Sequence, residues 1–168
     1  NLEINLLAQK IRKILKNENN PFALFNYSLL SNGVFIKIAG NANLQFQITS
    51  ECDSSVFVSP FLMIECGANS KVEIIYQEIR DHKAVAGMNS MLLLEAGNNS
   101  NINLNQLQMD GGNGFHLSQA RYDLSQFANV SVQGIFAGSE LARLDTKANL
   151  EAEGAEFNFS VLNVLKGI

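Results

Sequence analysis

Five short phrases of this chain read NANLQFQI (41–48), GANSKVEI (67–74), GNNSNINL (97–104), FANVSVQG (127–134) and GAEFNFSV (154–161). Each phrase opens with small or polar residues and continues with apolar residues at every second position. Alternation with a period of two is the pattern of a β-strand that buries one face. Aligned on their second residue, the phrases recur at intervals of 26, 30, 30 and 27 residues. The chain therefore repeats one structural unit five times.

The repeated unit has a strand on each side of the phrase. In the first four units an apolar residue also lies four positions before the alignment point: Ile38, Ile64, Leu94 and Leu124. Each unit thus reads as strand, tight turn, strand, and Gly and Asn are expected to supply the left-handed backbone angles of the turn. The same alignment pairs Ala42 with Ala68 and Phe46 with Val72.

A period of 26–30 residues built from strands alone predicts an all-β fold, a right-handed parallel β-helix. No single unit can enclose a core, but rungs stacked about 4.8 Å apart align equivalent side chains into continuous apolar ladders. The spacing of a leucine-rich repeat is missing, and a hexapeptide helix would need a much shorter period. A β-sandwich built from hairpins is the alternative.

The N-terminus follows a different pattern. Residues 2–17 place Leu7, Ile11 and Ile14 at helical spacing, with basic residues between them. A basic amphipathic helix could bind a membrane or a partner, or it could cap the open end of the solenoid, and we favour the cap. We therefore expect a helical cap over residues 1–19 and a β-helix over residues 20–168.

The composition excludes several classes of function. Apolar residues make up 46% of the chain, charged residues only 17%, and the net charge is −4. A negative chain does not attract nucleic acid by bulk charge, so we expect no nucleic-acid partner. No apolar stretch is long enough to span a membrane, and no signal peptide opens the chain. The expected location is the cytoplasm.

No catalytic motif stands out in the sequence, so no catalytic residue is assigned. Cys66 directly precedes Gly67, where small residues recur in other units, and we expect a buried thiol with a packing role. Cys52 lies in a polar stretch and is expected to be exposed. A metal site formed by Glu51, Cys52 and Asp53 is a weaker alternative.

Each of the two histidines allows more than one interpretation. His82 is expected to lie in an exposed loop. His116 lies between Phe115 and Leu117 in a strand-like segment, so its side chain should point away from the face that those two residues share. It is either a ligand or proton carrier, or a residue held by ordinary hydrogen bonds, and the second is favoured.

Glu65 and Glu95 occupy equivalent positions in neighbouring units. Their carboxylates would stack as like charges, which requires either solvation or a small cation between them. Solvation is the preferred interpretation.

Three stretches carry a family resemblance: NPFALFNYSLLSNGVFIKIAGN (20–41), FLMIECGANSKVEIIYQ (61–77) and GFHLSQARYDLSQFANVSVQGIFAGSELARLDTKANLEAEGAEFNFSVL (114–162). In this order they resemble the SufB/SufD family of iron–sulfur cluster assembly proteins. Asn20-Pro21-Phe22 and Phe115-His116 look more like SufD than SufB. Members of that family are right-handed parallel β-helices, so the resemblance implies the same fold as the repeat. Arg143 and Gly154 match only as structural motif residues.

The resemblance implies a non-catalytic scaffold subunit of a SufBCD-type complex that supports iron delivery. Its partners would be a SufB-like scaffold and a SufC-like ATPase. Iron or an iron–sulfur cluster would be handled by the complex, and no cofactor or metal ligand can be assigned to this chain. The later family regions are not in this sequence, so we expect either a truncated SufD-like β-helix core, which we favour, or a minimal homologue. Self-association through the open end of the β-helix is also expected.

Polysaccharide-binding or polysaccharide-cleaving β-helix proteins are the alternative class. Such proteins tend to expose aromatic platforms and clustered acidic and basic residues in a groove. Here Trp is absent, and basic residues such as Arg121 and Arg143 are scattered. The residues therefore favour the scaffold.

Overall fold

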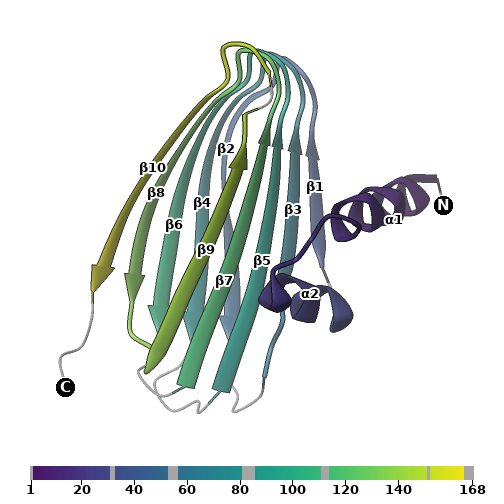
Figure 1. The fold of residues 1–168 in the computed structure, drawn as a ribbon. Helices are drawn as coiled ribbons and strands as arrows, with labels where there is room; N and C mark the ends of the chain where they lie inside the picture. Colours follow the sequence, from purple (N-terminus) through teal and green to yellow (C-terminus); the bar gives the residue numbers. More distant parts are fainter. Residues whose placement is uncertain are drawn as a thin grey trace.

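The computed structural model describes residues 2–30, 33–52, 57–80, 86–110, 114–150 and 152–164, and shows a parallel β-solenoid (Figure 1). Two five-stranded sheets face each other, and every strand pairs in parallel with its neighbours. Sheet A consists of β1 (Val34–Ile38), β3 (Phe61–Cys66), β5 (Ala86–Ala96), β7 (Gly114–Leu124) and β9 (Leu141–Asn149). Sheet B consists of β2 (Asn43–Cys52), β4 (Lys71–Arg80), β6 (Asn101–Asp110), β8 (Asn129–Ala137) and β10 (Glu156–Val164). The predicted solenoid is confirmed.

The register between rungs agrees with the sequence alignment at two of the four steps, Val72 with Ile102 and Val132 with Phe159, and is shifted by two residues at the other two. In sheet B, Phe46 pairs with Ile74, and Ile74 pairs with Leu104. The sequence alignment paired Phe46 with Val72 instead, an error of two residues. Because side chains alternate with a period of two, a shift of two keeps the same residues inside. The predicted buried face is therefore confirmed, although two of the four predicted pairings were wrong by two residues.

Tight turns join each strand of sheet A to the next strand of sheet B. One residue in each turn has a left-handed backbone: Asn41 (φ 60°), Asn69 (φ 57°), Asn99 (φ 55°), Phe127 (φ 56°) and Gly154 (φ 67°). Asn tolerates this conformation better than most residues, as the sequence suggested. Gly67 and Gly97 have a different role, because a Cβ on Gly67 would lie 2.4 Å from the Gly40 backbone nitrogen. These glycines let one rung's backbone lie directly against the next.

The apolar core lies between the two sheets, close to these turns. Its largest fully buried aliphatic side chains are Ile64, Leu92 and Leu94 from sheet A and Ile74, Ile102 and Leu104 from sheet B. Each side chain stacks on its equivalent in the next rung, so the core is continuous along the solenoid axis. Burying one such side chain contributes about 1.5–3 kcal/mol.

Helix α1 (Leu2–Leu15) does not cap the open end of the solenoid, contrary to the expectation from the sequence. Its Leu7, Ile11 and Ile14 pack on a second apolar cluster that includes Met63 and Leu93. That cluster lies on the outer face of sheet A, where Figure 1 shows both helices beside the strands. An apolar stripe can cover a sheet face as well as a sheet end, and the stripe alone does not distinguish them.

A second helix, α2 (Pro21–Ser28), was not predicted. Asn20 caps it by accepting a hydrogen bond from the Phe22 amide at 2.9 Å, and Pro21 suits the first helical position. The fully buried Asn26 donates its side-chain amide to the carbonyls of Asn89 (2.5 Å) and Pro60 (3.1 Å). These hydrogen bonds fix α2 to sheet A. Neither helix of the described chain is long and apolar enough to cross a membrane.

Candidate functional site

The solenoid interior changes from apolar to polar between its two ends. At the end away from the tight turns, inward-facing side chains of four neighbouring strands are polar or charged and almost fully buried: Tyr76, Glu78, Arg80, Ser90, Gln106, Gln108, His116 and Ser118. Asp110 joins them, with a side chain that is 0% exposed. We call these nine residues the interior cluster. They bring the ionisable groups of both sheets together inside the fold.

Glu78 is a hydrogen-bonding centre of the interior cluster. Its Oε1 accepts a hydrogen bond from the Tyr76 hydroxyl at 2.9 Å, and its Oε2 accepts one from the Ser118 hydroxyl at 3.3 Å. The Nε2 of His116 lies 3.3 Å from the same Oε2. Glu78 comes from sheet B and His116 from sheet A, so this ion pair links the two sheets.

Asp110 is the second acidic centre. Its Oδ2 lies 3.0 Å from His116 Nδ1 and accepts hydrogen bonds from Gln108 Nε2 (2.8 Å) and from the Ser139 hydroxyl. Its Oδ1 lies 3.5 Å from Arg80 Nε. His116 is therefore held between two carboxylates, one on each ring nitrogen.

The charges of the interior cluster determine its protonation. Burial would lower the pKa of His116, but the charge of Glu78 and the hydrogen bond to Asp110 outweigh it and raise this pKa to about 9. Burial would raise the pKa of Glu78, but His116 outweighs it, and the Glu78 pKa falls below its ordinary value. The pKa of Asp110 is lowered in the same way, mainly through its hydrogen bond to His116. At neutral pH two cations, His116 and Arg80, thus balance two carboxylates.

The chemistry open to the interior cluster is limited by its burial. The side chains of Glu78, Asp110 and His116 are all 0% exposed, so a substrate in solvent cannot touch them. Within the described residues, no group of three or more His, Cys, Asp or Glu side chains is arranged to hold a metal ion. The ion pairs and hydrogen bonds of the interior cluster connect the two sheets and stabilise their packing.

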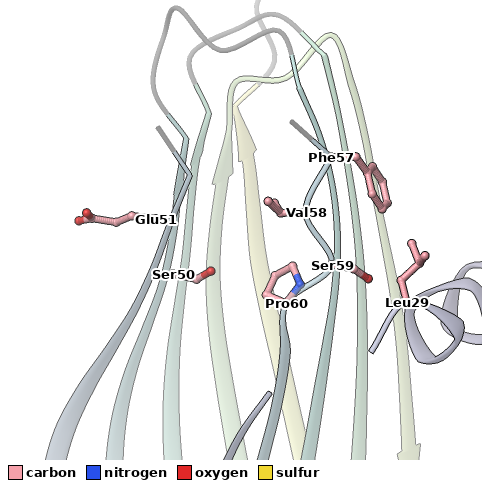
Figure 2. Close-up of a pocket in the computed structure, with 7 residues that line it drawn as sticks. All are labelled: Leu29, Ser50, Glu51, Phe57, Val58, Ser59 and Pro60. Carbon is pink, nitrogen blue, oxygen red and sulfur yellow. The ribbon is translucent and has the colours of Figure 1, made fainter. Parts of the chain in front are cut away.

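A hollow of about 390 Å³ opens one rung away from the interior cluster. Figure 2 shows Ser50 of β2 and Val58 and Pro60 of the segment before β3 pointing toward the space between the sheets, while Glu51 points away. Ser50 pairs in register with Glu78. The hollow thus lies one rung from Glu78 of the interior cluster.

The predictions for single residues had mixed outcomes. His116 points away from the face of Phe115 and Leu117 and is held by hydrogen bonds, as favoured. Cys66 is buried, and burial raises the pKa of its thiol to about 12, which confirms a packing role. His82 and Asp53 lie outside the described residues, as does the Cys52 side chain, so the proposed Glu51–Cys52–Asp53 metal site stays a prediction.

Only His116 of the interior cluster was identified in the sequence, and its other charged members, Glu78, Arg80 and Asp110, were missed. A signal for them was present. In β4 the inward positions run Val72, Ile74, Tyr76, Glu78 and Arg80, so continuing the alternation places both charges inside. Charged side chains at positions of a buried face indicate an internal ion pair, because an unpaired charge would be too costly to bury.

Glu65 and Glu95 lie opposite each other in register, as predicted, but they are not merely solvated. Lys10 of α1 contacts both, with its Nζ 2.7 Å from a Glu65 oxygen and 2.5 Å from a Glu95 oxygen. Burial would lower the Lys10 pKa, but hydrogen bonds to the two carboxylates outweigh it and raise this pKa. The cation between the stacked carboxylates is therefore a side chain of the N-terminal helix.

Replacing Lys10 with methionine should destabilise the protein by about 1 kcal/mol, because two carboxylates that face each other would lose their shared cation. The free energy of unfolding from urea titrations would measure this effect. Lys13→Met on the same helix is the control, since Lys13 forms no ion pair with the residues described. Equal losses in both variants, or a loss that persists undiminished in high salt, would contradict an electrostatic role.

The fold defines the class of parallel β-solenoid proteins, here with a charged interior at one end. Residues 46–167, more than two thirds of the chain, match the family model described as SUF system FeS cluster assembly, SufBD core domain. The chain belongs to this family, which supports a role in iron–sulfur cluster assembly. The match includes β3 to β10 and most of β2, whereas α1, α2 and β1 precede it. No curated protein and no solved structure matches the chain.

Proposed function

We propose that this chain is a non-catalytic, cytoplasmic scaffold piece of a SufBCD-type complex, where it supports iron delivery during iron–sulfur cluster assembly. The observation that carries the proposal is the SufBD core match over nearly the whole solenoid. Within the complex, a SufB-like scaffold and a SufC-like ATPase are the partners, and iron or the cluster is the cargo.

The interior cluster supports a structural rather than a catalytic role. Catalytic acids and bases must reach a substrate, within about 3 Å or through one water. Glu78, Asp110 and His116 are sealed from solvent and contact one another instead. A rigid solenoid stabilised in this way is a platform on which partners can be positioned.

The edges of the two sheets support binding to another β-rich protein. β9 and β10 each pair with a neighbour on one side only among the described strands. Unpaired backbone groups along such an edge can bind a strand of another chain, so a SufB-like partner or a second copy could continue the sheets. We favour the SufB-like partner because it also accounts for the family membership.

Co-expression with SufB-like and SufC-like proteins tests the proposal. The expected result is one complex that contains all three chains, with its mass measured by light scattering and its iron content higher than without this chain. Isolation of this chain alone, together with unchanged iron loading of the other two proteins, would refute the scaffold function. A screen for glycan binding would then be the next experiment.

A variant of the β10 edge makes this test specific. The Glu156 amide donates to the carbonyl of Ala128, the residue before β8, so in a parallel strand the Asn163 amide points to the free edge. Asn163→Pro removes that donor without touching the pairing with β8, and should weaken the complex if partners add to this edge. Ser160→Ala, exposed on the same strand, is the matched control and should assemble normally.

A further inference from the structure

A groove of charged and amide side chains lies outside the solenoid, between the helices and the outer face of sheet A. It joins two hollows of about 530 Å³ and 460 Å³ that share Arg121 of β7 and Lys147 of β9. We call these joined hollows the outer groove. Their sizes are typical of sites for small molecules.

Two lysines of the outer groove form no ion pair with the described residues. Arg121 and Lys147 are direct partners in the β7–β9 register, which places like charges side by side. Arg121 is fixed by Asp123 at 2.9 Å. Lys147 and Lys13, which lies across the groove on α1, contact no carboxylate in the described part of the chain.

The carboxylates that line the outer groove are already engaged elsewhere. Glu95 binds Lys10, Asp123 binds Arg121, and Asp145 binds Arg143 at 2.9 Å. Glu18 accepts hydrogen bonds from the backbone amides of Asn19 and Asn20. The two hollows are lined by four basic residues and four carboxylates, so the cations open to a ligand are the two lysines without an ion pair to the described residues, Lys13 and Lys147.

Gln119 provides an independent indication of a ligand. Its side chain lines the second hollow, where its register partner on β9 is Asp145, and the residue is only 4% exposed. Neither its amide nitrogen nor its amide oxygen has a hydrogen-bond partner among the described residues. Buried amides in native proteins are nearly always paired, so this one lacks a partner that a bound molecule could supply.

We propose that the outer groove binds a small organic polyanion, a polycarboxylate or a phosphate compound. Lys13, Arg121 and Lys147 contact its negative groups, and Gln119 hydrogen-bonds the same molecule. A bound anion also relieves the repulsion between Arg121 and Lys147. The site lies on the outer face of sheet A, and its Lys147 belongs to β9, the edge strand of that sheet.

Isothermal titration calorimetry of the purified chain tests the site, with citrate and pyrophosphate as the two probes. Saturable one-site binding of either probe is expected. Tighter binding of citrate would indicate a polycarboxylate ligand, and tighter binding of pyrophosphate a phosphate compound. Acetate at the same ionic strength should not bind. Affinity should fall as salt rises. Absence of saturable heat with both probes, or equal binding of acetate, would overturn the proposal.

Two substitutions test which residues hold the anion. Lys147→Gln should weaken binding roughly tenfold, as expected for a lost charge-assisted contact. Lys71→Gln is the matched control, because Lys71 is exposed on β4 of the opposite sheet, and its affinity should equal that of the wild type. Equal affinities of these two variants would overturn the assignment of Lys147.

Gln119→Leu should raise the thermal stability of the protein and lower its affinity for the probe. Leucine has a similar size and no unpaired polar atoms, so the ligand-free variant should melt at a higher temperature than the wild type. Its affinity for the probe should nevertheless fall roughly tenfold, because the hydrogen bonds to the ligand are lost. A variant that is more stable than the wild type and binds the probe equally well would show that Gln119 does not contact the ligand.

Discussion

Replacing His116 with alanine should destabilise the protein by about 3–5 kcal/mol. The substitution leaves Glu78 and Asp110 buried without their shared cation, and uncompensated buried charges carry costs of this size. Both carboxylates contact the His116 ring in the folded protein, at 3.3 Å and 3.0 Å. Guanidinium titrations followed by circular dichroism would measure the loss, since the chain has no Trp for fluorescence.

The same ion pairs predict how stability depends on pH. The pKa of His116 is raised to about 9 in the folded protein, against about 6.5 unfolded. The stabilisation by its positive charge is therefore complete below about pH 6.5 and is lost as pH rises through about 9. The lowered pKa values of Glu78 and Asp110 act in the opposite direction, so their contribution is lost on acidification.

A double-substitution cycle separates this interaction from a simple packing defect. Combining His116→Ala with Glu78→Gln removes one of the stranded charges, so the loss should be smaller than the sum of the single losses. Between pH 6.5 and 10 the wild type should approach the His116→Ala variant in stability. Strict additivity, together with a difference that does not change with pH, would contradict the ion-pair account.

Replacing Gly97 with alanine should cost roughly 3 kcal/mol, the upper part of the range for overpacking. The new Cβ would lie 2.7 Å from the Cys66 oxygen and 2.8 Å from the Ala68 nitrogen. These are backbone atoms of the preceding rung, so the two rungs must separate to make room. A glycine that only supplied flexibility would behave oppositely, because alanine would then stabilise by about 0.4–1 kcal/mol.

Ser125→Ala is the matched control for Gly97→Ala. Ser125 occupies the same corner one rung later, where its amide donates to Ala96 as the Gly97 amide donates to Cys66. Removing its hydroxyl adds no atom to the corner and should change stability by less than about 0.5 kcal/mol. Thermal unfolding of both variants gives the comparison, and a Gly97→Ala variant as stable as the wild type would exclude the close contact between rungs.

The sequence predicts most of the solenoid because its determinants are local and repeated. Alternating apolar residues identify the buried faces, and an Asn such as Asn69 or Asn99 identifies a turn. The register could not be read in the same way. Shifting Phe46 from Val72 to Ile74 changes no buried face, so the alternation contains no information about that shift.

The interior cluster could be predicted only in part, because its members meet through the fold. The positions of Glu78 and Arg80 follow from the alternation in β4, but their partners come from other rungs and from the opposite sheet. His116 and Glu78 are 38 residues apart in the chain and 3.3 Å apart in space. The packing site of α1 was also unpredictable, because the outer face of sheet A and the end of the solenoid are both apolar surfaces.

The stacking of rungs has a consequence for how the chain folds. Residues that pair across neighbouring rungs lie about one repeat apart in sequence, so a nucleus of two rungs can grow by adding the next one. Such growth would leave each rung nearly independent, but the contacts of Glu78, Asp110 and His116 cross β4, β6 and β7 at once. We therefore expect those three strands to gain and lose their structure as one cooperative block, with loss of order starting at the outermost rungs.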